Sequence, residues 1–195
     1  LVPALRSKKI LVIGGGPAGC EAARVLALRG HQPVVIEAGQ ALGGNLLPGG
    51  APEFKADDLA LARWYAHQLE ELGVEVRLNT RADEALIHEE KPEAIIFATG
   101  SRPKTLPLEG DHIFTAEDVL LGKKDPGSSA VLIGGGLVGC ETALWLAKKG
   151  VKAILVEALG KLLAVNGPLC HANSEMLEAL IPFHGIQVHC NTTVK

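Results

Sequence analysis

The sequence has few cysteines, few aromatic residues and no long apolar run. Its four cysteines stand at positions 20, 140, 170 and 190, without a close pair or a metal-like cluster. No CxxC or CxxxxC pair occurs, which argues against a dithiol redox centre and against a disulfide framework, so a reducing cytoplasm is expected. The longest apolar runs, LVIGGG and AILVEALG, are strand-sized and far below the roughly 20 residues that span a bilayer. The start LVPALRSKK also lacks the apolar core of a signal peptide.

A strong excess of charge of either sign is also missing. The 195 residues carry a net charge of -3, which gives no footprint for nucleic acid or for an anionic membrane. Seven histidines are scattered without metal-ligand spacing, and neither a Ser-His-Asp set nor a P-loop is found. We therefore predict no catalytic side chain and no metal site in this chain.

The chain does contain one glycine-rich stretch twice. IGGGPAGCEAARVLALRG at 13–30 returns as IGGGLVGCETALWLAKKG at 133–150, an offset of 120 residues. Each copy follows an apolar run, KKILV or SSAVL, and each is followed by a second apolar run that ends in Glu37 or Glu157. Strand, glycine turn, helix and strand form a βαβ unit, so the sequence predicts an α/β protein with two Rossmann-like units.

Each repeated position has a physical reason to be there. The first glycine makes the strand-to-helix turn, the second lets a diphosphate approach the backbone, and the third lets the helix pack closely on the strand. The helix N-terminus presents free N–H groups to the phosphates, and the glutamate accepts hydrogen bonds from ribose hydroxyls. The alternative, that one copy is only a tight packing turn, stays open.

Two such sites in one chain suggest a path for electrons from a nicotinamide to a flavin. The first copy is followed by a second glycine pair in LGGN (42–45) and by the small-residue turn ATG (98–100), and we expect it to bind FAD. The second copy lacks both features and is expected to bind the nicotinamide dinucleotide. Glu157 would repel a 2′-phosphate, no arginine follows it nearby, and Lys161 is expected to be solvated, so NADH is preferred to NADPH. The predicted cofactor-binding residues are Gly14, Gly16, Pro17, Ala18, Gly19, Glu37, Ala38, Gly43, Gly44, Asn45, Ala98, Thr99 and Gly100 for FAD, and Gly134, Gly136, Leu137, Val138, Gly139 and Glu157 for NADH.

The pattern of apolar residues predicts the remaining elements. Helices are expected at 17–30, 57–73, 137–149 and 174–183. Strands are expected at 8–13, 33–38, 74–79, 93–97, 128–133, 152–158 and 186–194. The glycine- and proline-rich segment 39–55 is expected to be a loop, and 101–128 a linker or domain change. We assign residues 1–110 to an FAD-binding domain and 111–195 to an NAD(P)-binding domain.

These stretches resemble the two-dinucleotide flavoproteins of the glutathione-reductase-like class. More narrowly, KKILVIGGGPAGCEAARVLALRGH, LGGNLLPGGAPEFK, ATGSRP and VLIGGGLVGCETALWLAKKG resemble the C-terminal part of NADH:flavin oxidoreductases such as 2-enoate reductase and 2,4-dienoyl-CoA reductase. GGNLLPGG and LLAVNGPLCHANSEML resemble the 2-enoate reductases in particular.

The resemblance implies an N-terminal barrel with FMN and an iron–sulfur cluster, to which electrons pass from NADH through FAD for the reduction of an activated C=C bond. None of that barrel is in the sequence, so it would be the chain's partner. The resemblance also implies that the chain is truncated at its C-terminus, within the NAD(P)-binding domain, and lacks the segment that returns to the FAD domain. An incomplete sheet would leave an edge for a second copy of the chain.

Two other functions stay open at this point. The chain could be a nucleotide-binding or docking domain without activity of its own, or part of another two-dinucleotide enzyme such as a glutamate-synthase-like small subunit. The cysteines at 20 and 140 lie in the helices after the turns, where we expect small buried apolar residues rather than reactive thiols.

Overall fold

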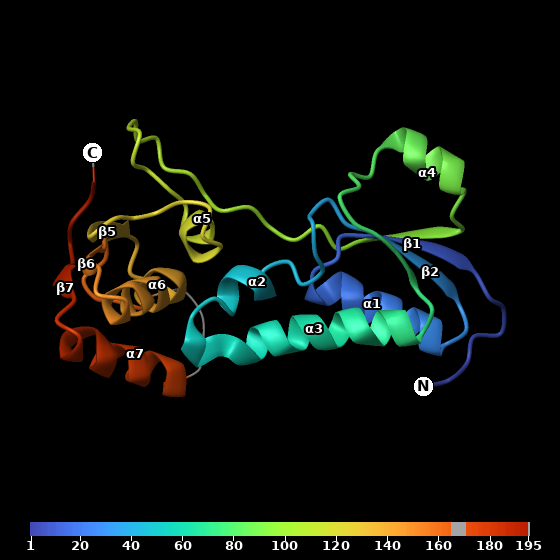
Figure 1. Ribbon diagram of the computed structural model, residues 1–195, viewed down its shortest axis with the longest axis horizontal. Coiled ribbons are helices and arrows are strands. Elements are labelled where there is room, and N and C mark those ends of the chain that lie inside the picture. Colours follow the sequence, from blue (N-terminus) through green and yellow to red (C-terminus); the bar gives the residue numbers. More distant parts are fainter. Residues whose placement is uncertain (165–170, 195) are drawn as a thin grey trace. The chain divides into compact units, whose positions relative to one another are not determined.

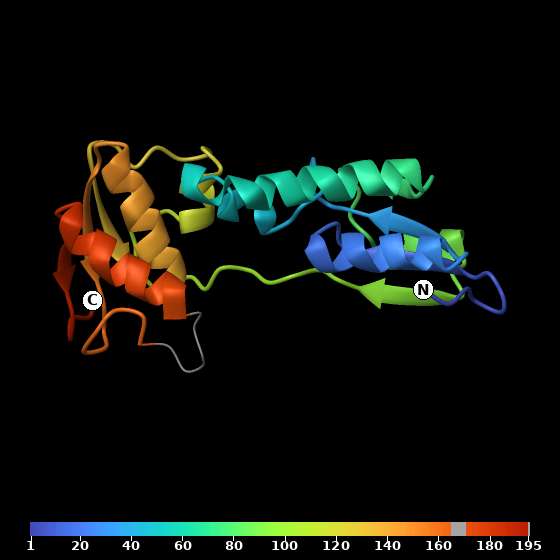
Figure 2. The ribbon, with the colours of Figure 1, turned by 90° about the horizontal axis from the view of Figure 1, so that it is seen from below.

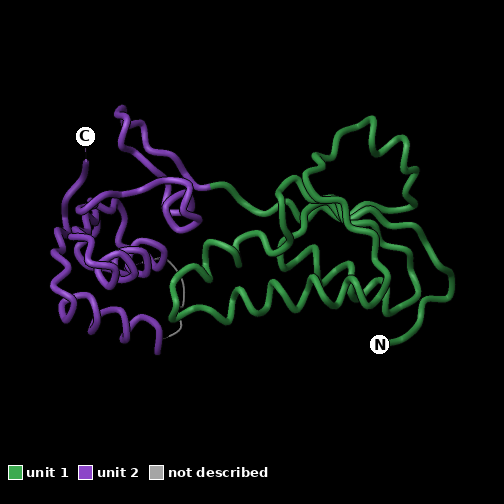
Figure 3. Tube along the Cα trace, viewed as in Figure 1, with its two compact units in different colours: residues 1–102 green, residues 103–195 purple. Residues whose placement is uncertain are grey.

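The protein divides into two compact units, residues 1–102 and 103–195 (Figure 3). The structure is a computed structural model that describes residues 1–164 and 171–194. Each unit is built on its own parallel β-sheet, with four strands in unit 1 and three in unit 2. The α/β fold with two Rossmann-like units is thus confirmed. The cofactor assigned to each unit stays a prediction.

Unit 1 is a sheet with strand order β3-β2-β1-β4, the order of the first half of a doubly wound fold. Its strands are β1 (Lys9–Ile13), β2 (Gln32–Ile36), β3 (Glu75–Arg77) and β4 (Ala94–Phe97). Its helices are α1 (Pro17–Leu28), α2 (Leu46–Gly49), the 3₁₀ turn η1 (Glu53–Lys55), α3 (Ala56–Glu71) and α4 (Glu84–Glu90).

Helices cover both faces of this sheet, because alternate residues of each strand point to opposite faces. Val12 packs with Cys20 of α1 and Leu69 of α3 on one face. Leu11 packs with partly buried Leu86 of α4 on the other. Figures 1 and 2 show α1 and α3 side by side along the first face and α4 across the second. Burial on both faces explains why the central strands are apolar without alternation.

Two parts of unit 1 differ from the sequence prediction. The segment 39–55 contains α2 and η1 rather than loop alone, and the unassigned segment before β4 forms α4. Helix α4 is capped by Asp83, the residue before its first turn, whose carboxylate accepts a hydrogen bond from the Leu86 N–H at 2.8 Å. A short capped helix of this kind has too little periodicity to stand out in the sequence.

Unit 2 repeats the same order in a three-stranded sheet, β5-β6-β7. Its elements are α5 (Ala116–Leu120), β5 (Ser129–Ile133), α6 (Leu137–Lys148), β6 (Lys152–Val156), α7 (His171–Phe183) and β7 (Gln187–His189). The short helix α5 lies inside the segment expected to be a linker, and β7 ends earlier than the expected 186–194 strand. The offset of 120 residues relates three pairs of elements in the two units: β1 and β5, α1 and α6, and β2 and β6.

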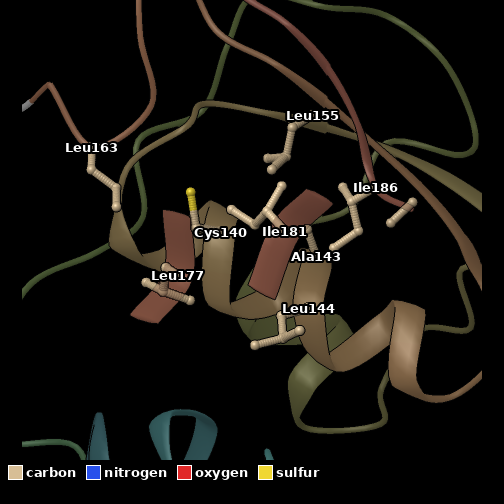
Figure 4. Close-up of a cluster of buried hydrophobic side chains, with 9 residues drawn as sticks. Cys140, Ala143, Leu144, Leu155, Leu163, Leu177, Ile181 and Ile186 are labelled. Atoms are coloured by element: carbon tan, nitrogen blue, oxygen red, sulfur yellow. The ribbon is translucent and has the colours of Figure 1, made fainter. Parts of the chain in front are cut away.

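One cluster of buried side chains forms the core of unit 2 (Figure 4). It joins β6 to α6 and α7 and includes Leu155, Leu144, Leu177 and Ile181. Leu163, from the segment after β6, belongs to the same cluster. The core therefore ties that segment to the two helices that cover the sheet.

The other face of β5 is exposed. Val131 is 60% exposed and Ile133 is 45% exposed, whereas Leu132 between them packs against the core. Strand β5 pairs only with β6 among the described strands, so it is an edge strand. In unit 1 the equivalent edge of β1 is paired with β4.

Candidate functional site

The first glycine turn connects β1 to α1 and is shaped by Gly14. Its N–H donates to the carbonyl of Ile36 at 2.8 Å, and its φ is +108°, a left-handed conformation that favours glycine. A side chain here would collide with the carbonyl of Ala98. Gly14 is therefore required both by its conformation and by the close approach of the segment after β4.

The beginning of α1 presents backbone amides outward. Gly16 is the N-cap in an extended conformation, without a capping side chain, and Pro17 follows at the first helical position. The first bond within the helix runs from the Cys20 N–H to the Gly16 carbonyl. The amides of Ala18 and Gly19 consequently have no acceptor within the helix, as a phosphate site requires.

The third glycine brings the helix close to the strand. A Cβ at Gly19 would fall on the carbonyl of Gly14, so only glycine allows this packing. The turn thus uses Gly14 and Gly19 for its shape, whereas Gly16 has room for a Cβ and is the position predicted to face a diphosphate.

Glu37, directly after β2, reaches back to the turn. Its Oε2 accepts a hydrogen bond from the Gly15 N–H at 2.5 Å, and its Oε1 accepts one from the Gly39 N–H at 2.6 Å. Each carboxylate oxygen keeps a further lone pair, so the group can still accept bonds from ribose hydroxyls. Ala38 continues the chain without a bulky side chain beside the carboxylate.

Two further predicted segments reach the same turn. The Gly43 N–H donates to the Gly15 carbonyl at 2.8 Å. A Cβ on Gly44 would lie 2.9 Å from the Gly16 Cα. Asn45 continues this segment as the N-cap residue of α2.

The small-residue turn after β4 lies on the other side. The Ala98 N–H donates to the Ile13 carbonyl at 2.8 Å, and Ala98 and Thr99 lie beside Gly14, with Gly100 next in the chain. Unit 1 thus gathers all four of its predicted segments around one turn.

Unit 2 reproduces this geometry with its own residues. Gly134 has a φ of +107° and donates to the Val156 carbonyl, while Gly136 is the N-cap of α6. A Cβ at Gly139 would fall on the Gly134 carbonyl. Leu137 and Val138 are the first two residues of α6, and Val138 is 62% exposed.

Glu157 is the counterpart of Glu37 in unit 2. Its Oε1 and Oε2 accept hydrogen bonds from the N–H groups of Leu159 and Gly135, each at 2.6 Å. These two bonds lower the pKa of the Glu157 carboxyl below its usual value, against a smaller opposing effect of burial. The group is therefore a fixed negative charge at neutral pH.

The two units differ in what surrounds the turn. In unit 2 no glycine pair follows β6, and a Cβ on Gly134 would meet no described atom within 4 Å, whereas Gly14 is covered by Ala98. The predicted FAD site is thus lined by a glycine pair and by the Ala98 segment, whereas the described part of unit 2 has neither beside Gly134. The predicted NADH site is more open.

The cysteines of both helices are buried, as predicted. The Cys20 thiol donates to the Gly15 carbonyl at 3.2 Å and the Cys140 thiol to the Gly135 carbonyl at 3.4 Å. Burial raises the pKa of Cys20 to about 11 and that of Cys140 to about 12, so neither is a thiolate at neutral pH. Both act as small side chains under the turn.

Sequence reasoning missed the middle glycine and the leucine that covers it. A Cβ on Gly15 or Gly135 would lie 2.5 Å from the Cδ2 atom of Leu42 or Leu162, respectively. The two leucines are 120 residues apart, so the repeat continues beyond the glutamates. Extending the comparison of the two copies by five residues would have found them.

Together, two parallel βαβ units, each with an amide-lined turn and a carboxylate held against it, define the doubly wound class of dinucleotide-binding folds. Residues 8–195 match the family described as pyridine nucleotide-disulphide oxidoreductase, and the chain belongs to that family. The predicted resemblance to two-dinucleotide flavoproteins is confirmed.

Similar proteins include reductases of the predicted type. The chain is 50% identical to a cinnamate reductase of Clostridium sporogenes, over 96% of this chain and 28% of that protein. It is 45% identical to an NADH oxidase of Thermoanaerobacter brockii, over 78% of this chain and 24% of that protein. A solved complex of 2-naphthoyl-CoA reductase with 2-naphthoyl-CoA matches the whole chain with a TM-score of 0.91 and 30% identity, over 29% of its own chain. The chain therefore spans less than a third of the length of these relatives.

Other kinds of site were not found in the part of the chain that the structure describes. Within residues 1–164 and 171–194, no group of three metal-ligating side chains comes together. None of the described helices is both long and apolar enough to cross a bilayer. Cys20, Cys140 and Cys190 are free thiols.

Proposed function

We propose that unit 1 binds FAD and unit 2 binds NADH, within the electron-transfer region of a flavin-dependent oxidoreductase. The observation that carries this proposal is the duplicated turn, with Gly16 and Gly136 bare at the helix start and Glu37 and Glu157 held beside them. When both cofactors are bound, the nicotinamide supplies a hydride that the flavin accepts.

The chain's own residues bind and orient these groups. The amides at the start of α1 and α6 would receive the diphosphates, and the two glutamates the ribose hydroxyls. The backbone of Gly43, Gly44 and the Ala98–Gly100 turn favours the larger cofactor in unit 1, because these small residues let the backbone come close to the glycine turn and to a ligand bound there. The fixed charge of Glu157 favours NADH, since it repels a 2′-phosphate.

We further propose that electrons leave the flavin for an iron–sulfur cluster and FMN in a barrel region outside this chain, which reduces an activated C=C bond. The cinnamate reductase and 2-naphthoyl-CoA reductase relatives support this proposal, and both are more than three times longer than the chain. The barrel region would also determine the substrate specificity.

Two alanine substitutions test the assignment of the cofactors. A Cβ on Gly16 meets only the Gly44 Cα, at 3.9 Å, among the described atoms, so the fold accepts alanine there. Gly136 is the matching N-cap of α6 and has a similar negative φ, which alanine also adopts. We expect Gly16→Ala to weaken FAD binding at least about tenfold and leave NADH binding unchanged, because the methyl group enters only the first diphosphate site. Gly136→Ala should show the reverse.

The measurements are flavin absorbance after reconstitution and calorimetry with NADH. Gly30→Ala is a control for stability alone, because Gly30 has a φ of +88° at the far end of α1. It should lower the free energy of unfolding by about 1 kcal/mol without changing either affinity. If the two variants weakened both ligands equally, or if the parent chain retained no flavin, the assignment would be wrong.

A docking domain that binds only an adenine nucleotide is the second candidate. The turn of unit 1 and Glu37 favour it, because they would bind a diphosphate and a ribose, the two groups that ADP shares with FAD. Tight binding of ADP without retention of FAD would identify this case. Bleaching of bound flavin by NADH in the absence of oxygen would exclude it.

A further inference from the structure

Leu163 has a backbone conformation that leucine rarely adopts. Its φ is +56°, in the left-handed region where a Cβ crowds the neighbouring carbonyl. The residue is also buried, with only 8% of its surface exposed. Strain of this kind persists only where the surrounding structure enforces it, and it concentrates at functional sites.

The repeat shows what this conformation is for. Leu163 is 120 residues after Gly43, which also has a positive φ, of +121°. The N–H of each residue donates to the carbonyl of the middle glycine of its own turn, Gly15 or Gly135, at 2.8 Å. Both units therefore use the same backbone bond to hold the glycine turn from the segment after the second strand.

The two units support this bond differently. In unit 1 there is no space for a side chain, because a Cβ on Gly43 would lie 2.9 Å from the Ala62 Cβ of α3. In unit 2 the Leu163 side chain itself enters the core and joins the cluster that contains Cys140 and Leu177 (Figure 4). The bond from Gly43 is thus supported by the close approach of α3, and the bond from Leu163 by the packing of its own side chain in the core.

These contacts connect the core of unit 2 to the predicted ribose-binding group. The Leu163 side chain is held by the core, and its N–H holds the Gly135 carbonyl. The Gly135 N–H in turn donates to Glu157 Oε2 at 2.6 Å. Each step is a direct contact, and none of them involves a ligand.

We infer that Leu163 is a positioning residue for the nucleotide turn of unit 2. Its buried side chain keeps the left-handed backbone in place, so that Gly135 and Glu157 are set before a nicotinamide dinucleotide binds. This inference rests on the proposed NADH site and adds the residue that organises it.

Leu163→Gly is the test, because glycine accepts the left-handed conformation and keeps the N–H but loses the side chain in the core. We expect the dissociation constant of NADH to rise about tenfold through loss of preorganisation. Leu177→Ala is the matched control, since Leu177 is fully buried in the same cluster, on α7. It should lower the melting temperature at least as much and change NADH binding less than about twofold, because it removes core packing alone. Leu163→Met, which keeps the bulk, should restore binding.

A second readout needs no nucleotide. Amide hydrogen exchange of the Gly135 N–H, measured by NMR on the unliganded chain, should be about tenfold faster in Leu163→Gly than in Leu177→Ala. If both variants changed NADH binding and Gly135 exchange equally, Leu163 would be an ordinary core residue and the inference would be wrong. If the parent chain bound no NADH, the proposed function would fail, whereas the exchange rates would still decide the role of Leu163.

Discussion

Glu37 and Glu157 obtain their positions from backbone amides rather than from cations. Each carboxylate accepts two N–H groups, one from the middle glycine of its turn and one from two residues further along the chain. Backbone donors of this kind cannot rotate as side chains do, so each charge is held in one place. The same bonds keep Glu157 ionised, because they lower its pKa.

This charge should set the preference for NADH. We expect Glu157→Gln to reduce the ratio of NADPH to NADH dissociation constants about tenfold, because the repulsion of the 2′-phosphate is lost. Glu37→Gln, the equivalent change in unit 1, is the control and should leave that ratio unchanged. The measurement is a pair of binding titrations with the two nucleotides. An unchanged ratio in Glu157→Gln would mean that another group reads the 2′ position.

The pH dependence of this preference follows from the direction of the shift in pKa. Glu157 is ionised above its lowered pKa, so it keeps its charge from neutral pH down to the usual range of a glutamate. The preference for NADH should therefore weaken first near pH ~6, where the 2′-phosphate of NADPH loses one of its two negative charges. It should be lost only as the pH falls through the lowered pKa of Glu157. The same titrations at several pH values check this.

At the scale of single elements, α4 is a short helix with a side-chain cap at its start. It has seven residues, and no residue in it is fully buried. A helix of this length is marginal alone, so its first turn needs the bond from the Leu86 N–H to Asp83. Glu90, at its other end, forms ion pairs with Arg77 and Lys9. The helix is thus capped at its start by Asp83 and joined at its end to β1 and β3 by ion pairs.

Removing the cap should therefore destabilise unit 1. We expect Asp83→Ala to lower the free energy of unfolding by about 1 kcal/mol, measured by urea denaturation. Asp57→Ala is the control, because Asp57 lies inside the first turn of α3 and does not cap it. That change should cost only a few tenths of a kcal/mol. Equal losses in the two variants would contradict the role of the cap.

At the scale of the whole molecule, strand β5 has one exposed apolar face and one edge that no described strand pairs with. Val131 and Ile133 are large, apolar and more than two-fifths exposed on an edge strand. Natural sheets rarely leave such an edge bare, because it pairs with another chain. The equivalent edge in unit 1 is paired with β4.

We expect the chain to self-associate through this strand as its concentration rises. The double substitution Val131→Lys with Ile133→Lys should reduce that association, because it places two like charges on the edge. Sedimentation velocity over a range of concentrations measures it. The control is Leu61→Lys with Trp64→Lys, two exposed apolar residues on α3 that are not on a strand. An equal effect of both pairs would point to general apolar contact instead of pairing at the edge.

The sequence by itself determined the parts of this protein whose physics is local. A glycine turn between a strand and a helix, and a glutamate after the next strand, depend on residues within 25 positions of one another, and the repeat at 120 residues doubled the signal. Helices α1, α3 and α6 and the parallel strands beside them could be predicted, because each has an apolar pattern that is regular along the whole element.

Only the tertiary structure decided the contacts between distant segments. The approach of Ala98 to Gly14, the α4 cover on the second face of the sheet, and the left-handed backbone of Leu163 each need groups that are far apart in the chain or a core that is already formed. The sequence pattern at Leu163 is that of any buried leucine, because the strain is imposed by packing around it and not by its neighbours in sequence.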